Sequence, residues 1–155
     1  MKPEIKKLLI ALAIPLAVGG LSALLSGGMS DYLVLNRPPL SPPGWLFPIV
    51  WTVLYLLMGY GSYRVAVKGA EAGRTRRALL VYGAQLLVNF LWPIVFFGFD
   101  MWLTAFFILI GLWVLIFWNI RLFSKIDETA GDLLLPYILW VTFAGYLNLG
   151  IFLLN

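Results

Sequence analysis

The sequence contains neither cysteine nor histidine, and it carries little charge. Without cysteine the chain has no disulfide, no thiol nucleophile and no Cys-ligated zinc or iron–sulfur cluster. Without histidine it has no imidazole base and none of the usual ligands of haem or of catalytic metals. These absences exclude most of the familiar catalytic machinery, and we expect no metal site.

Charged residues make up 12% of the chain and hydrophobic residues 62%, whereas roughly a quarter of the residues in a soluble domain are charged. One membrane crossing takes about 20 apolar residues. Five uncharged stretches reach that length: Leu8–Gly28, Gly44–Tyr63, Ala78–Phe99, Met101–Ile120 and Leu133–Leu154. We therefore predict an all-α membrane protein, a bundle of five transmembrane helices in one domain over residues 1–155. The expected helices cover about 8–28, 44–67, 77–99, 101–123 and 132–154.

Basic residues gather on one side of this expected bundle. They precede the first span, follow the second and follow the fourth: Lys2, Lys6, Lys7, Arg64, Lys68, Arg74, Arg76, Arg77, Arg121 and Lys125. Arg37 is the one basic residue expected on the other side. Because basic flanks stay on the cytoplasmic side during insertion, we predict a cytoplasmic N-terminus and an external C-terminus. The net charge of +4 is thus a topology signal that also favours contact with anionic lipid, and we expect no nucleic-acid binding.

The acidic residues lie at or beyond the ends of the spans: Glu4, Asp31, Glu71, Asp100, Asp127, Glu128 and Asp132. No ionisable side chain is therefore expected near the middle of the bilayer. Because proton-coupled and ion-coupled transporters normally need one there, this pattern argues against those classes.

Amides and aromatic rings recur at helical spacing inside three spans. Gln85, Asn89 and Trp92 share one face of the third span, and a polar face in hydrocarbon must point inward. The second and fifth spans carry similar stripes: Pro48, Trp51, Tyr55 and Met58, and Trp140, Phe143, Ala144 and Leu147, with Asn148 adjoining. Three helices can thus contribute to one cavity for a flat ligand. Two alternatives stay open, because aromatic stripes commonly form core or lipid contacts, and a hydrogen bond between helices explains Asn89 as well as a ligand does.

The connection between the first two spans is rich in proline: Pro38, Pro39, Pro42 and Pro43. Proline fixes its own backbone and biases the preceding residue towards extended conformations. We expect a stiff, non-helical loop that covers the outer mouth of the bundle.

Three motifs carry a resemblance to a known family. The pattern from Asp31-Tyr32 through Pro42-Pro43-Gly44-Trp45 to Trp51 and Leu54-Tyr55 resembles the first loop and second helix of the translocator protein family (TspO/MBR, the peripheral benzodiazepine receptor family). "NFLWPIVFF" (89–97) resembles its third-helix motif, and "LLLPYILWVTFAGYLN" (133–148) its fifth-helix motif.

This resemblance implies a five-helix bundle, often a homodimer, in a bacterial-type member placed in the cytoplasmic membrane. Its pocket beneath the first loop would bind tetrapyrroles such as protoporphyrin without a further cofactor, and two tryptophans, here Trp51 and Trp140, would take part in light-dependent porphyrin degradation. The other ligand-binding positions carried over are Tyr32, Pro42, Pro43, Asn89, Trp92, Phe143, Ala144 and Leu147. Arg37 is the candidate partner for porphyrin propionates, and ordinary loop solubility explains it equally well.

Other functions remain open at this stage. A small-molecule transporter or efflux-linked component is the main alternative, and a structural membrane subunit is a third. The sterol pattern of vertebrate members requires a basic residue after the position of Tyr146, and none follows here. Gly19 and Ala23 have a spacing that suits helix pairing between subunits or packing within one bundle.

Overall fold

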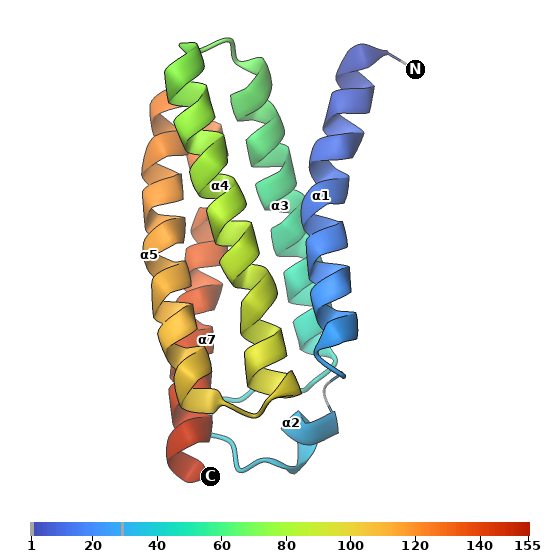
Figure 1. Ribbon diagram of the computed structural model, residues 1–155, viewed down its shortest axis with the longest axis vertical. Helices are drawn as coiled ribbons and strands as arrows, with labels where there is room; N and C mark the ends of the chain where they lie inside the picture. The colour runs from blue at the N-terminus through green and yellow to red at the C-terminus, as the bar shows by residue number, and fades with distance from the viewer. Residues whose placement is uncertain (1, 29) are drawn as a thin grey trace.

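The computed structural model describes residues 2–28 and 30–155 and forms a bundle of five long helices (Figure 1). These are α1 (Pro3–Leu25), α3 (Leu46–Val67), α4 (Ala72–Pro93), α5 (Trp102–Ile126) and α7 (Leu135–Leu154). Each is long and apolar enough to cross a membrane. The span of α4 continues through the π-helical turn η1 (Ile94–Gly98), and the span of α7 begins with the short helix α6 (Glu128–Asp132). The predicted all-α membrane fold is confirmed, and no strand occurs in the described ranges.

The helix ends differ from the apolar spans for local reasons. α1 begins at Pro3, five residues before the uncharged stretch, because proline fits the first turn of a helix, where its missing N–H costs nothing. α1 ends at Leu25, since Gly27 and Gly28 have φ angles of 82° and 89°, the left-handed conformation in which glycine ends helices. At the end of α4, Pro93 is followed by the π-helical turn η1.

The proline-rich segment lies across one end of the bundle, between the short helix α2 (Ser30–Val34) and the C-terminal end of α7 (Figure 1). The Tyr146 hydroxyl donates a hydrogen bond to the Pro39 carbonyl at 2.7 Å. Pro38 packs so closely on Gly150 that a Cβ at Gly150 would lie 2.6 Å from the proline ring. The loop of residues 35–45 is therefore held against α7, where Tyr146 lies 107 residues after Pro39 in the sequence.

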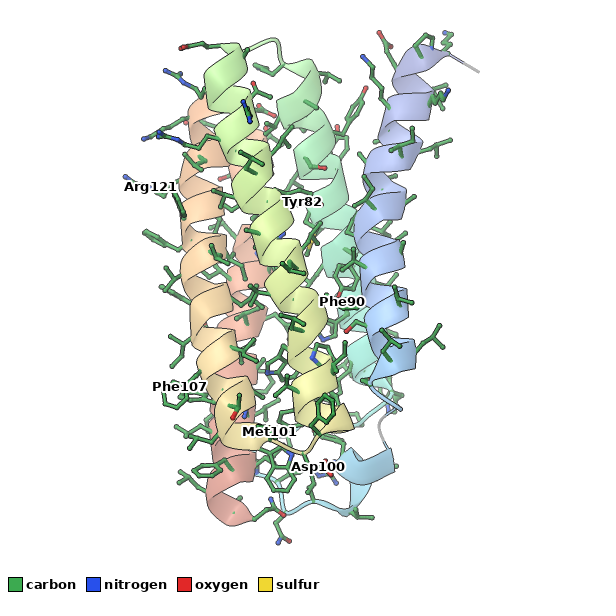
Figure 2. All side chains as sticks on the ribbon, viewed as in Figure 1. Tyr82, Phe90, Asp100, Met101, Phe107 and Arg121 are labelled. Atoms are coloured by element: carbon green, nitrogen blue, oxygen red, sulfur yellow. The ribbon has the colours of Figure 1, made fainter. Side chains whose placement is uncertain are left out.

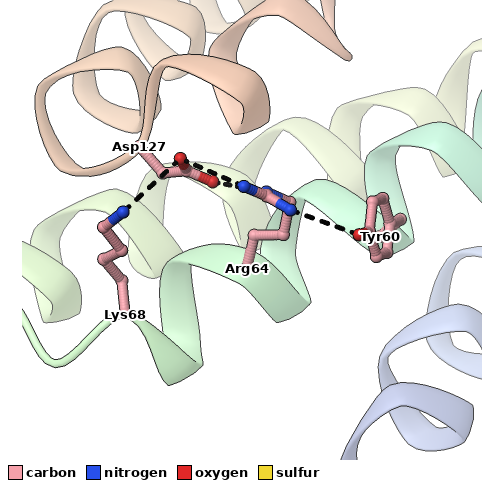
Figure 3. A network of polar contacts seen from close by, with 4 residues as sticks. All are labelled: Tyr60, Arg64, Lys68 and Asp127. Carbon is pink, nitrogen blue, oxygen red and sulfur yellow. Dashed lines mark hydrogen bonds and ion pairs between the residues drawn. The ribbon is translucent and has the colours of Figure 1, made fainter.

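The opposite end holds the N-terminus and the connection between α3 and α4 (Figure 1). There Arg64 of α3 donates hydrogen bonds from Nε and Nη2 to Asp127, at the junction of α5 and α6, and from Nη1 to the Tyr60 hydroxyl (Figure 3). Lys68 Nζ lies 3.9 Å from the same carboxylate. Asp127 is 8% exposed, and the hydrogen bonds from Arg64 hold the pKa of its carboxyl below the ordinary value. This cluster ties α3 to the α5–α6 junction.

Two glycines allow α1 and α3 to approach closely. A Cβ on Gly59 would lie 2.7 Å from the Ala11 carbonyl oxygen, and a Cβ on Gly19 would lie within the Tyr55 ring. Gly19 is therefore used for packing inside the bundle. By contrast, Phe107 and Arg121 on α5 project away from the bundle (Figure 2).

Candidate functional site

A cavity of about 360 Å³ lies among α1, α3 and α4, at the end covered by the loop. Its walls combine small residues with aromatic rings and two prolines. The lining residues are Leu16, Gly19, Gly20, Ala23, Ser26, Gly28, Phe47, Pro48, Trp51, Thr52, Tyr55, Trp92, Pro93 and Phe97.

The α1 wall is hollow because it is built from small side chains. Gly20 has nothing within 4 Å of where a Cβ would stand, and Ala23 follows three residues later, one turn along the helix. Ser22 fastens this part of α1 to α4, since its hydroxyl donates a hydrogen bond to the Phe90 carbonyl at 2.7 Å. The cavity therefore lies beside a contact that fixes the distance between α1 and α4.

Aromatic rings form the facing wall. Trp51 stacks on Tyr55 with ring centroids 5.7 Å apart and an interplanar angle of 30°. Trp92 lies 5.1 Å from Phe96 and 6.0 Å from Phe97, and its indole N–H donates to Asn148 Oδ1 at 3.0 Å. The indole nitrogen of Trp92 is thus already bonded within the protein, while its ring lines the cavity.

Behind this wall, a chain of hydrogen bonds joins three helices. The Tyr55 hydroxyl donates to Asn89 Oδ1 at 2.8 Å, Asn89 Nδ2 donates to the Tyr137 hydroxyl at 2.7 Å, and Tyr137 donates to Gln85 Oε1 at 2.6 Å. Gln85 and Asn89 are buried, so the prediction that this face of the third span points inward is confirmed. The Asn89 amide is engaged between helices, which was one of its two possible roles.

The fifth-span stripe lies elsewhere. Ala144 and Leu147 of α7 are buried in the core, and Trp140 and Phe143 are half-buried. None of the four lines this cavity, whose walls come mainly from α1, α3 and α4, so a contribution of α7 to the ligand site stays a prediction. Phe47 lines the cavity, and its ring lies 5.8 Å from that of Trp140, so this ring is next to both.

Trp140 nevertheless has a polar atom with no partner. Its indole Nε1 is buried and makes no hydrogen bond with any described residue. A buried donor without a partner costs free energy, and an acceptor on a ligand would satisfy it.

The predicted loop residues cover this end of the site. The Tyr32 hydroxyl donates to the Pro42 carbonyl at 2.9 Å, and its ring meets Phe47 edge-on at 5.2 Å. The Arg37 guanidinium stands 4.7 Å from the centre of the Tyr32 ring, an arrangement that favours a cation. Pro42 is buried, whereas Pro43 and Arg37 are exposed.

The α1 wall and Phe47 were not predicted from the sequence. Gly19 and Ala23 stood out only as a small-residue pair suited to helix packing, and Gly20 gave no separate signal. Since the pairing of α1 with α3 and α4 depends on tertiary contacts, periodicity within one span could not reveal it.

The fold and this site define a multi-pass integral membrane protein of five helices, with an aromatic-walled cavity beside a proline-rich loop. The sequence profile of the TspO/MBR family matches residues 11–154. The chain belongs to that family.

Relatives from distant organisms cover most of the chain. The Tryptophan-rich protein TspO of Chlorobaculum tepidum is 32% identical over 157 residues, covering 100% of this chain and 99% of the relative. Protein CrtK of Rhodobacter capsulatus is 36% identical over 88% of this chain and 85% of its own length. The Translocator protein of Bos taurus is 34% identical over 78% of this chain and 72% of its own length.

Proposed function

We propose that this protein binds tetrapyrroles of the protoporphyrin type in the membrane, as a receptor or scavenger, and degrades them in light. The main support is the cavity whose wall carries Trp51 and Trp92. A free-base porphyrin is a flat π-system that stacks on indole rings, and burial of its apolar area stabilises the complex by about 25 cal/mol per Å². It requires no axial ligand, which suits a chain without histidine or cysteine.

The size of the cavity adds a condition to this proposal. Its volume of about 360 Å³ is at the lower end of the range of about 300–1,000 Å³ for ligand pockets, so a porphyrin needs more room. Phe47 separates the cavity from Trp140. In our proposal the Phe47 ring moves aside on binding, and the tetrapyrrole then reaches both Trp51 and the unpartnered indole N–H of Trp140.

Arg37 is our candidate partner for the propionates. Arg37 is exposed on the loop that covers this end of the bundle. It is the one basic residue expected on the external side of the membrane. Displacement of its guanidinium from the Tyr32 ring would allow a charge-assisted hydrogen bond to a carboxylate.

We also propose a cytoplasmic N-terminus, an external C-terminus and a homodimer in a bacterial cytoplasmic membrane. The orientation is supported by the basic residues at the end that holds the N-terminus. The homodimer and the bacterial membrane rest on the family resemblance.

Titration of the detergent-purified protein with protoporphyrin, first in darkness and then under illumination, tests the function. We expect saturable quenching of tryptophan fluorescence in darkness and loss of the porphyrin absorption bands in light. A Trp51→Phe, Trp140→Phe double variant should still bind porphyrin but lose the light-dependent step, because the two tryptophans proposed to take part in that step are gone.

The dark titration tests binding and the illuminated titration tests degradation, so the two proposals can be disproved independently. Saturable binding with equal photobleaching in the wild type and the double variant would disprove the role of the two tryptophans and leave the receptor proposal standing. An absence of saturable quenching in the wild type would disprove tetrapyrrole binding, and would favour transport or a structural role.

A further inference from the structure

A second hollow lies near the opposite end of the bundle from the loop. It has a volume of about 530 Å³ and is lined by Gly73, Arg76, Arg77, Leu80 and Val81 of α4 and by Trp118 of α5. The α4 residues recur at steps of three and four, so they share one face of that helix. Gly73 leaves the hollow open at its outer edge, since nothing stands within 4 Å of where its Cβ would lie.

The positive charge in this groove is not neutralised within the chain. Arg76 and Arg77 are exposed, and within residues 2–28 and 30–155 the ion pairs closer than 4.0 Å join Asp127 to Arg64 and Lys68. No side chain caps the start of α4, because Glu71 at the N-cap makes no capping hydrogen bond. The positive charge of the groove therefore rests on the two arginine side chains, since the dipole of α4 acts mainly on its first turn, beside Glu71.

A third arginine, Arg121, lies on α5 near the groove but does not line it. Arg121 follows Trp118 by three residues, so the two side chains lie on the same face one turn apart. Its side chain projects away from the bundle in the view of Figure 2. The charged residues that line the groove itself are therefore Arg76 and Arg77 of α4.

The deeper part of the groove is apolar and remains uncovered by the protein. Leu80 is 62% exposed and Trp118 is 48% exposed, and both lie farther along their helices from the end of the bundle than the nearest arginines. Tryptophan is enriched at the level of lipid headgroups. Charge at the membrane edge followed by apolar surface one turn deeper is the order of groups in a phospholipid.

We propose that this groove binds an anionic phospholipid, with the headgroup phosphate on Arg76 and Arg77 and an acyl chain along Leu80 and Trp118. Guanidinium groups match phosphate oxygens in a bidentate geometry, which distinguishes a specific site from general attraction to a charged surface. The lipid site is separate from the aromatic cavity and does not depend on its ligand.

Thermal unfolding of the full chain in an uncharged detergent, with phosphatidylglycerol or phosphatidylcholine added, tests the proposal. We expect a saturable rise in Tm with phosphatidylglycerol and none with phosphatidylcholine. In an Arg76→Gln, Arg77→Gln variant the half-saturating concentration of phosphatidylglycerol should rise at least about tenfold, because two phosphate contacts are lost. A Lys6→Gln, Lys7→Gln control removes the same charge from the same end of the bundle and should behave as the wild type does.

Three outcomes would overturn the proposal. An equal rise in the half-saturating concentration of phosphatidylglycerol in the Lys6→Gln, Lys7→Gln control would show that the lipid is attracted by overall charge and not bound at a site. An equal rise in Tm with phosphatidylcholine would show that the headgroup charge is not recognised. A rise produced by inorganic phosphate alone, at the same concentration, would show a site for free phosphate. If the double variant does not fold, a Gly73→Leu variant keeps every charge but fills the hollow, and it should show the same loss of phosphatidylglycerol affinity.

Discussion

The bundle is packed differently on the two sides of Tyr55: one side is a hydrogen-bonded core, and the other, beside α1, contains a cavity. On one side the Tyr55 hydroxyl enters the hydrogen-bonded chain through Asn89, Tyr137 and Gln85, where α3, α4 and α7 meet. On the other side the Tyr55 ring rests on Gly19 and lines the cavity. Because α1 contributes glycine and alanine there, Tyr55 borders both the hydrogen-bonded chain of the core and the aromatic cavity.

A ligand can enter more easily beside α1 than in the core. In the core every hydrogen-bonding group of the Asn89 chain faces a partner, so a ligand would have to break existing bonds. The buried residues of α1 itself are Pro15 and Ser22, and space remains between its small side chains and the aromatic rings that face it. Ligand binding is therefore expected to depend on α1, whereas stability is expected to depend on the core.

The largest expected effect comes from breaking the core. Asn89→Leu removes the acceptor of Tyr55 and the donor to Tyr137. The buried Tyr55 hydroxyl is then left without a partner, and the Tyr137 hydroxyl keeps only its bond to Gln85. We expect a loss of about 2–4 kcal/mol in the free energy of unfolding, measured as a fall in Tm in detergent. A Thr52→Val control removes an exposed hydrogen bond of the cavity wall and should change Tm little. A fall in Tm no larger than that of Thr52→Val would contradict our description of the core.

Adjacent glycines on α1 should respond in opposite directions. Gly19→Ala places a methyl group within the Tyr55 ring, which is held by its bond to Asn89, and should destabilise the protein by about 1–3 kcal/mol. Gly20→Ala meets nothing within 4 Å and should stabilise the protein by up to about 1 kcal/mol through helix propensity. Tm measured for the two variants side by side checks this, and equal shifts would show that α1 does not pack on Tyr55.

Phe47 should control access between the cavity and Trp140. Phe47→Ala removes the ring that separates them, so we expect protoporphyrin to associate several-fold faster in stopped-flow measurements of fluorescence quenching. Phe107→Ala is the matched control, because Phe107 is 62% exposed on the outer side of α5 (Figure 2). An unchanged rate in the Phe47 variant would mean that this ring does not limit entry.

The smallest expected effect concerns the ion cluster at the other end. Arg64 lowers the pKa of Asp127 from its ordinary value of 3.8, so the cluster stabilises the fold at pH values above 3.8 and this contribution is lost as pH falls through the lower, folded-state pKa. Asp127→Asn should lower Tm by about 2–4 °C at neutral pH, and its difference from the wild type should shrink on acidification below pH 3.8. Asp100→Asn removes the same charge at the loop end of the bundle and should show neither effect. A difference that is independent of pH would contradict the role of the carboxylate.

Much of the fold could be predicted because hydrocarbon imposes strict conditions on a sequence. Uncharged stretches of sufficient length identified the five crossings, and the spacing of Gln85 and Asn89 indicated a face that had to be buried. The identity of their partners could not be predicted, because Tyr55 and Tyr137 come from helices whose rotation and pairing are set by packing. The short helices α2 and α6 and the π-turn after Pro93 were missed for a similar reason, since each depends on local contacts and not on a long periodic pattern.

The candidate site was predicted in part. Trp51 and Trp92 do meet at one cavity, as their positions on the second and third spans suggested. Trp140 lies behind Phe47 because the rotation of α7 and the path of the loop decide which face it presents. The glycine wall of α1 escaped notice because the absence of a side chain leaves no periodic signal.

Protoporphyrin binding by a Gly20→Leu variant, compared with a Gly111→Leu control, tests whether the ligand occupies the cavity beside α1. Both glycines are helical and have nothing within 4 Å of an added Cβ, but Gly20 lines the cavity and Gly111 does not. Dark titrations followed by tryptophan quenching should show that Gly20→Leu weakens binding by at least about tenfold, since its side chain fills space that the ligand needs, while Gly111→Leu binds as the wild type does and both variants remain folded. Unchanged affinity in a folded Gly20→Leu protein would contradict the claim that the ligand occupies the cavity beside α1.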